Sequence, residues 1–209
     1  MNIDPEFVVS SHAQLRDIVG PVDEHIAAKS IDHIDQYCAT FIDHAPFVLI
    51  ASRAGDALLD ISPKSDAPGF VSVLNENWLA ILDRPGNARH DTYENIFADN
   101  AVALLFLIPG RNDTLRIAGR ATLTEDPKPA EQFAIRGRVP TFVLLIEVHE
   151  AFMHCTKCGI RSGLWRPEAW PDTAAVPSLA EAYMADARIS MPIDEMEAEL
   201  RRDEKEELY

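Results

Sequence analysis

Cysteine is scarce in this chain: its 209 residues include three, a small and odd number that argues against a disulfide framework and for a reducing compartment. Long apolar runs are missing as well, since none approaches the roughly 18 residues that a membrane-spanning helix needs. The first residues, MNIDPEFVVSSHAQL, have neither the basic nor the apolar region of a secretory signal. We therefore expect a cytoplasmic protein that does not associate with membranes.

Basic side chains are in deficit, with 19 Lys and Arg against 34 Asp and Glu and a net charge of −15. This balance argues against nucleic-acid binding, which depends on cations that neutralise phosphates. The acidity is uneven: residues 1–45 carry −6 and residues 168–209 carry −8, whereas residues 46–167 hold 13 of the 19 bases and carry −1. A near-neutral middle segment can still concentrate positive potential at one site.

Seven short runs rich in β-forming residues fill the middle of the chain, separated by turn sequences such as RAGD, NEN and PGRND. Most of these connections are too short for parallel crossovers, so neighbouring strands should be antiparallel. The sequence thus predicts a mainly β fold with flanking helices, built on an antiparallel barrel. The expected strands are residues 47–52, 58–62, 70–74, 78–82, 101–108, 115–123 and 142–148.

Helical patterns flank and interrupt these strands. Apolar residues at three- and four-residue steps predict one core-facing helix over residues 22–43, and the capping-box spacing of Asp91 and Glu94 predicts a short helix from Asp91. Further expected helices are an insertion at 129–140, part of 150–170, and two terminal helices at 178–189 and 192–209. We therefore expect an N-terminal helical extension (1–45), a barrel (46–167) and an acidic helical C-terminal extension (168–209).

The segment DRPGNAR, residues 83–89, places Arg84 and Arg89 around a Pro-Gly turn ahead of a predicted helix. By itself it could be a solvated polar turn. However, Arg guanidinium groups form paired hydrogen bonds to phosphate oxygens, and free backbone amides before a helix add donors. Ser62 and Lys64 lie two residues apart on a strand, so they share a face and could reach the same anion. The combination indicates a phosphate site.

Five blocks in order resemble the FMN-binding split barrels related to pyridoxamine 5'-phosphate oxidase, and most closely a bacterial branch with no settled substrate. The resemblance spans residues 26 to 165. The blocks are SPKSD (62–66) followed by Gly69-Phe70, ILDRPGNAR (81–89), LLFLIPG (104–110), TLRIAGRA (114–121) and FMHCTKCGIRSGLW (152–165).

This resemblance implies a split barrel of the FMN-binding type that forms a homodimer with FMN at the interface. It also implies an FMN-dependent oxidoreductase that acts on an unidentified small organic molecule, with the flavin exchanging hydride or electrons; no catalytic side chain is predicted. On the phosphate and ribityl side of FMN it places Ser62, Lys64, Arg84, Asn87 and Arg89. Near the flavin ring or the partner's cofactor it places Lys157, Arg161, Ser162 and Trp165.

Two departures from the pyridoxamine phosphate oxidases proper bear on the substrate. Asp60 stands where those enzymes begin a strand with a basic residue, and LWRPEAW does not match their C-terminal Arg motif. Both argue against oxidation of vitamin B6 phosphates. Two alternatives stay open: a flavin-binding protein or sensor without turnover, and a reductase of the same fold that uses the deazaflavin F420.

The sequence HCTKC contains Cys155 and Cys158, and a Cys-x-x-Cys motif can be a redox pair or half of a zinc site. A zinc site would need a second pair of ligands, and only Cys38 remains as a further cysteine. We therefore expect no metal, and we expect these thiols to be buried and to pack near the flavin.

Overall fold

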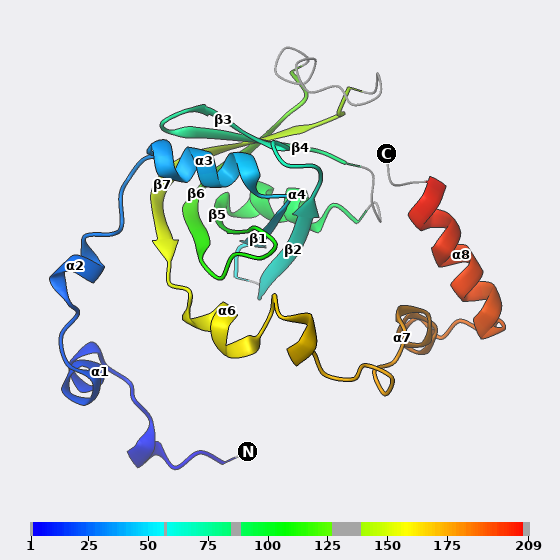
Figure 1. The fold of residues 1–209 in the computed structure, drawn as a ribbon, viewed down its shortest axis with the longest axis horizontal. Coiled ribbons are helices and arrows are strands. Elements are labelled where there is room, and N and C mark those ends of the chain that lie inside the picture. Colours follow the sequence, from blue (N-terminus) through cyan, green and yellow to red (C-terminus); the bar gives the residue numbers. More distant parts are fainter. Residues whose placement is uncertain (1, 57, 85–88, 127–138, 207–209) are drawn as a thin grey trace.

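One curled antiparallel sheet forms the centre of the computed structural model, which describes residues 2–56, 58–84, 89–126 and 139–206 (Figure 1). Its seven strands follow the order β2-β1-β5-β6-β7-β4-β3, and all neighbours are antiparallel. Every strand expected from the sequence is present, which confirms the split-barrel prediction. The strands are β1 (Phe47–Arg53), β2 (Leu59–Ser65), β3 (Val71–Asn75), β4 (Trp78–Leu82), β5 (Ala101–Leu107), β6 (Thr114–Thr124) and β7 (Val143–His154).

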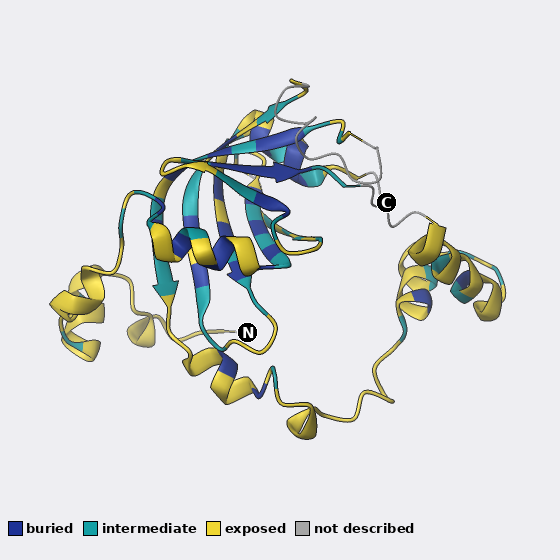
Figure 2. Cartoon of the chain, turned by 45° about the horizontal axis from the view of Figure 1, so that its top comes forward, coloured by how far each residue is buried: buried dark blue, intermediate teal, exposed yellow. Residues whose placement is uncertain are grey.

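The core lies on the inner face of the curled sheet. In β1, Val48 and Ile50 are fully buried, whereas Leu49 and Ala51, which point to the other face, are only partly buried. This alternation follows from the two-residue period of a strand. Figure 2 shows buried residues on most strands of the sheet, and β2 is the strand in which no described residue is buried.

Two helices cover the core. The helix α3 (Gln36–His44) packs on β3, β6 and β7 and buries Phe41 and Ile42, while α4 (Asp91–Ala98) packs on β1, β2 and β6 and buries Tyr93 and Ile96. Each helix thus supplies one apolar face to the core and leaves its other face exposed.

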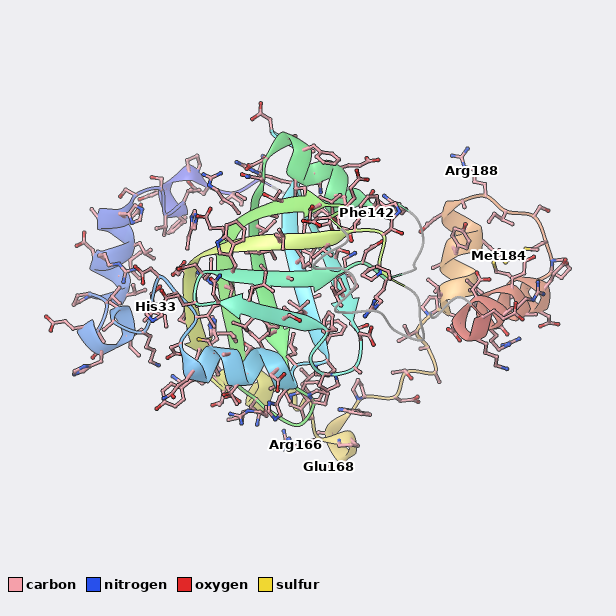
Figure 3. The ribbon with its side chains drawn as sticks, turned by 90° about the horizontal axis from the view of Figure 1, so that it is seen from above. His33, Phe142, Arg166, Glu168, Met184 and Arg188 are labelled. Atoms are coloured by element: carbon pink, nitrogen blue, oxygen red, sulfur yellow. The ribbon has the colours of Figure 1, made fainter. Side chains whose placement is uncertain are left out.

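The remaining helices lie outside the barrel and are largely exposed (Figure 2). Seen from above in Figure 3, the N-terminal and C-terminal helices project on opposite sides. The two C-terminal helices were expected, and they pack on each other through Ala180 and Met196. The helices outside the barrel are η1 (Pro5–Phe7), α1 (His12–Val19), α2 (Glu24–Ala27), α6 (Lys157–Ser162), η2 (Pro167–Ala169), α7 (Leu179–Asp186) and α8 (Ile193–Glu206).

The single helix expected over residues 22–43 is wrong, because a turn, a single β-bridge residue and a bend separate α2 from α3. Ile31 exchanges backbone hydrogen bonds with Ala151 of β7 (3.0 and 2.8 Å), so it belongs to the edge of the barrel. The Asp35 carboxylate then accepts hydrogen bonds from the backbone amides of Tyr37 and Cys38 and starts α3 as its N-cap. Backbone pairing here outweighs the helical spacing of the apolar residues.

The strand β7 extends six residues beyond the expected end at Val148, to His154. Across β6 and β7, Gly119 pairs with Val148 and Ala118 with Glu150, so His149 is one extra residue, a β-bulge. The bulge shifts the alternation of buried residues along β7 by one position. For this reason the apolar pattern in the sequence predicted that the strand ends at Val148. At this point Gly119 approaches the carbonyl oxygen of Glu147 so closely that a Cβ atom would collide with it.

Three features expected from the sequence, a turn, a helical insertion and the domain boundaries, have no counterpart among the described helices and strands. The Pro85-Gly86 turn and most of the helical insertion at 129–140 lie outside the described residues. The domain boundaries at 45 and 167 stay predictions. Among the described helices, none is long and apolar enough to cross a membrane.

We predict that Gly119→Ala destabilises the barrel by about 3 kcal/mol, the upper end of the usual cost of overpacking, because the added methyl group forces the backbones of β6 and β7 apart. Urea unfolding would show this as a lower midpoint at an unchanged m-value.

The matched control is Gly55→Ala, where a Cβ atom meets nothing within 4 Å and only the positive φ of +56° opposes the side chain. That variant should lose about 1 kcal/mol. If the two variants lost the same free energy of unfolding, the close approach of β6 and β7 at Gly119 would not be what opposes a side chain there.

Candidate functional site

A cavity of about 210 Å³ lies where the end of β2, the chain after β4 and the start of α4 meet. We call it the polar cavity, because charged and hydroxyl side chains dominate its wall. It adjoins a second space of about 280 Å³ that reaches inward to Ile50, Phe70 and Leu144. The polar cavity is lined by Asp60, Ile61, Ser62, Pro63, Lys64, Asp83, Arg84, Arg89, His90, Asp91 and Thr92.

Ser62 and Lys64 share one face of β2, as the sequence predicted. The residues Asp60, Ser62 and Lys64 are partly buried, while the residues between them are exposed. The Lys64 ammonium lies 5.7 Å from the centre of the Tyr93 ring, a cation–π contact that holds the side chain toward α4.

Arg84 lies at the cavity wall in a buried ion pair. Its Nε donates to Oδ2 of Asp66 at 2.5 Å, and the Asp66 side chain is only 2 % exposed. Asp66 follows β2 and Arg84 follows β4, so the pair joins two strands that lie far apart in the sheet order. The guanidinium is thereby fixed in position before any ligand arrives.

Arg89 is exposed and donates from Nε to Oδ2 of Asp91 at 2.8 Å. This hydrogen bond raises the pKa of the Arg89 guanidinium, which keeps it charged. The expected capping box at Asp91 is wrong: α4 begins at Asp91, and His90 is its N-cap in the left-handed region at φ 55°. The Asp91 carboxylate faces Arg89 instead of capping the helix.

Two buried polar atoms of the polar cavity, the Thr92 hydroxyl and Oδ2 of Asp60, have no hydrogen-bond partner in the described part of the chain. Asp83 accepts from the Tyr93 hydroxyl at 2.6 Å, and burial together with this bond raises the pKa of Tyr93. A buried hydroxyl without a partner is costly, and a ligand oxygen would satisfy it. The donors present fit a phosphate. Three carboxylates share the cavity: Asp83 is bonded to Tyr93 and Asp91 to Arg89, whereas Oδ2 of Asp60 has no partner within the described residues.

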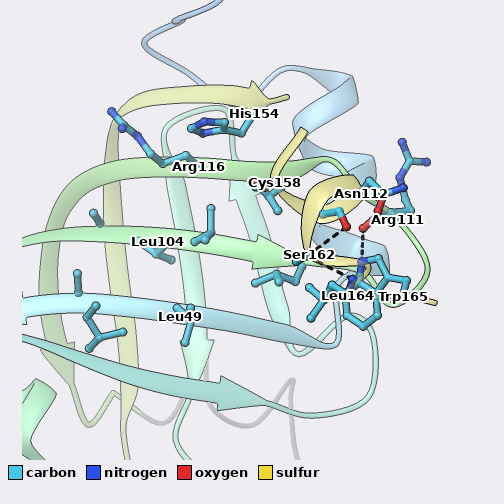
Figure 4. Close-up of a pocket in the computed structure, with 17 residues that line it drawn as sticks. Leu49, Leu104, Arg111, Asn112, Arg116, His154, Cys158, Ser162, Leu164 and Trp165 are labelled. Carbon is cyan, nitrogen blue, oxygen red and sulfur yellow. Dashed lines mark hydrogen bonds between the residues drawn. The ribbon is translucent and has the colours of Figure 1, made fainter. Parts of the chain in front are cut away.

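A second cavity, of about 550 Å³, opens on the outer face of the sheet (Figure 4). We call it the apolar cavity. Its floor is formed by the outward side chains of three adjacent strands, and Leu49 lies directly opposite Leu105 in the sheet register. Polar groups such as Arg111, Arg116 and His154 lie along its rim. The floor residues are Leu49, Ala51, Ile61, Ala103, Leu105 and Leu107.

The wall of the apolar cavity comes from α6 and the residues after it. Trp165 donates from its indole Nε1 to the carbonyl oxygen of Arg111 at 2.5 Å (Figure 4). Gly159 lies so close to Asn112 that a Cβ atom would stand 2.8 Å from the amide oxygen of that side chain. These contacts fasten α6 to the turn between β5 and β6.

The structure therefore divides the predicted site residues between two cavities. Four of them meet at the polar cavity, and Ser162 and Trp165 line the apolar cavity. Lys157 and Arg161 are exposed on α6 and line neither cavity, and Asn87 lies outside the described residues. The four at the polar cavity are Ser62, Lys64, Arg84 and Arg89.

The expectation of buried thiols in HCTKC is wrong, since Cys155 and Cys158 are both exposed. Only Cys38 is buried, and burial raises the pKa of its thiol to about 11. No group of three or more metal-ligating side chains occurs within the ranges that the structure describes.

Sequence reasoning missed Asp66, Thr92 and Tyr93. The pairing of Asp66 with Arg84 bridges 18 residues and depends on the curl of the sheet, so no local pattern announces it. The sequence did place Tyr93 on the apolar stripe of α4, and the residue is buried there, but the stripe does not mark its hydroxyl as part of the site.

Comparisons with known proteins show to which family this chain belongs. The family model for pyridoxamine 5'-phosphate oxidase matches residues 34–155. The comparison with curated proteins gives no match.

Three solved structures illustrate the similarity. The HupZ protein of Group A Streptococcus is 18% identical over 57% of this chain and 93% of that chain, with a TM-score of 0.45. General stress protein 26 of Bacillus anthracis is 16% identical over 55% and 88%, with a TM-score of 0.39. A protein described as an F420 reductase is 13% identical over 54% and 93%, with a TM-score of 0.41. Because the family match covers more than half of the sequence, the chain belongs to the pyridoxamine 5'-phosphate oxidase family.

Proposed function

We propose that this protein is an FMN-dependent oxidoreductase that acts on a small organic molecule. The observation that carries the proposal is the convergence of Ser62, Lys64, Arg84 and Arg89 beside the Thr92 hydroxyl at the polar cavity, in a member of this family. A phosphate brings a charge of about −2 and several acceptor oxygens, and these residues offer cations and hydroxyl donors at one place. FMN, when bound, supplies the hydride or electron exchange.

Asp60 bears on which part of FMN and which substrate the polar cavity can accept. Its carboxylate lines the same cavity, and its buried Oδ2 has no partner in the described structure. A carboxylate repels a phosphate but accepts hydrogen bonds from hydroxyl groups. We therefore assign Asp60 to the ribityl side of the flavin, and we propose a substrate other than a vitamin B6 phosphate.

We propose further that two copies of the chain form a dimer over the apolar cavity. The outer face of β1, β2 and β5 is uncovered, and Ile61 and Leu59 are 63% and 72% exposed. A contiguous apolar surface of this kind marks a contact between proteins, and a two-fold axis lets one patch cover its own copy. Lys157, Arg161, Ser162 and Trp165 lie at or beside this face, so the dimer would bring them toward the partner's flavin.

The first test is the visible absorption spectrum of the freshly purified protein, followed by the mass of the chromophore released by heat. We expect a flavin spectrum and the mass of FMN. A colourless protein that takes up no added FMN would refute the cofactor assignment, and a released deazaflavin would favour F420. Steady-state turnover with a panel of donors and acceptors would then separate an enzyme from a flavin carrier.

The second test isolates the phosphate contacts. We predict that Lys64→Ala and Arg89→Ala each weaken FMN binding by about 10- to 100-fold, the usual worth of a hydrogen bond to a charged group. Riboflavin, which lacks the phosphate, is the control ligand, and its affinity should not change. Fluorescence titration measures both, and an equal loss for the two ligands would contradict a phosphate role.

Arg84 should stay unchanged in that experiment. Removing it would leave the nearly fully buried Asp66 carboxylate without this cation, and breaking a buried pair costs about 3–5 kcal/mol. Loss of flavin from an Arg84 variant would therefore mix loss of stability with loss of binding.

The third test concerns the dimer. We predict that Ile61→Glu converts the protein to a monomer and lowers its flavin content, because a charge in the centre of an apolar interface is left unpaired. Light scattering after gel filtration measures the mass. The control is Leu74→Glu on β3, where the side chain is 45% exposed at the opposite end of the sheet order. A wild-type monomer, or an unchanged Ile61→Glu dimer, would rule out this interface.

A further inference from the structure

The exposed cysteines Cys155 and Cys158 have no part in the function proposed above. They lie where β7 leads into α6, and Cys158 lines the apolar cavity (Figure 4). Both thiols are accessible, in contrast to the buried Cys38. A reactive pair needs exposure and a short distance between the two sulfur atoms.

The local backbone brings the two cysteines together. Thr156 is in the right-handed helical region (φ −73°, ψ −10°), and α6 begins at Lys157, so a single turn separates the cysteines. Such a turn keeps the Cα atoms of its first and last residues within about 7 Å, near the range that a disulfide spans. The Cys158 sulfur lies 4.0 Å from the backbone carbonyl oxygen of Cys155, so the thiol of Cys158 lies over the turn that begins at Cys155.

The segment that carries the pair, residues 151–167, is basic. It contains Lys157, Arg161 and Arg166. Of the two acids that flank it, Glu150 is paired with Arg116 at 3.5 Å, and Glu168 follows the first residue of η2. Asp113, in the turn between β5 and β6, is paired with Arg111 at 2.6 Å. Positive potential of this kind raises the local concentration of anionic reactants.

We propose that Cys155 and Cys158 form a reversible dithiol–disulfide couple beside the apolar cavity, oxidised by exchange with a small anionic disulfide. One cysteine thiolate attacks a sulfur atom of the disulfide RSSR, forming a mixed disulfide and releasing RS⁻. The second thiolate attacks the protein sulfur of the mixed disulfide, which forms the Cys155–Cys158 bond and releases the second RS⁻. Two electrons pass from the protein to RSSR, and the two cysteine protons end on two RSH.

This couple does not depend on flavin binding. A zinc site is a poor alternative, because it needs four ligands and no cluster of three such side chains occurs in the described ranges. Since α6 also carries Ser162 and precedes Trp165, oxidation would constrain the turn that leads into the cavity wall.

The experiment uses the full chain incubated with glutathione and glutathione disulfide at a series of ratios. After acid quenching and alkylation of the unfolded protein, intact mass and peptide mapping report the state of each cysteine. We expect an internal Cys155–Cys158 disulfide, seen as a loss of two hydrogens and protection of both residues from alkylation. Cys155→Ser and Cys158→Ser should each take up one glutathione, and Cys38→Ser should behave as the wild type.

Two results would overturn the proposal. The first is a wild-type protein that stays fully reduced, or carries separate glutathione adducts on both cysteines, at ratios where the single-cysteine variants react. The second concerns the charge of the reactant: glutathione disulfide should react about tenfold faster than the cationic disulfide cystamine at low salt. Equal rates would refute the preference for an anionic disulfide.

Discussion

The buried ion pair between Arg84 and Asp66 is the contact on which the candidate site depends. In the sheet order, β2 is one edge strand and β4 lies next to the other edge, yet Asp66 follows β2 and Arg84 follows β4. The pair can form only because the sheet curls until its two ends approach each other. It then holds the face of β2 that carries Lys64 against the chain that enters α4, which creates the polar cavity.

The curl itself has an identifiable source in β6 and β7, the two longest strands. The extra residue His149 and the close approach of Gly119 to Glu147 form a β-bulge in the middle of this pair. A bulge bends a strand and increases its local twist. Hydrophobic burial by α3 and α4 then stabilises the closed form.

Local patterns predicted the parts of this fold that depend on local physics. Runs of β-forming residues between turn sequences located all seven strands, and the two-residue period of a strand placed Ser62 and Lys64 on one face. The failures have tertiary causes: Ile31 pairs with Ala151 on β7, and the bulge at His149 hides the end of that strand. The exposure of Cys155 and Cys158 could not be predicted from the sequence either, because it depends on where α6 lies relative to the barrel.

The two cavities differ in chemical kind, and this difference bears on the proposed cofactor. The polar cavity gathers cations, carboxylates and hydroxyl groups, whereas the floor of the apolar cavity is made of aliphatic side chains with Trp165 at its wall. FMN has the same division, with a charged phosphate at one end and a flat, largely apolar ring at the other. Within one chain the two sets occupy opposite faces of β2, so a single copy does not join them. A second copy that covers the outer face is the simplest arrangement in which both would serve one flavin, and the dimer and the cofactor therefore form one hypothesis.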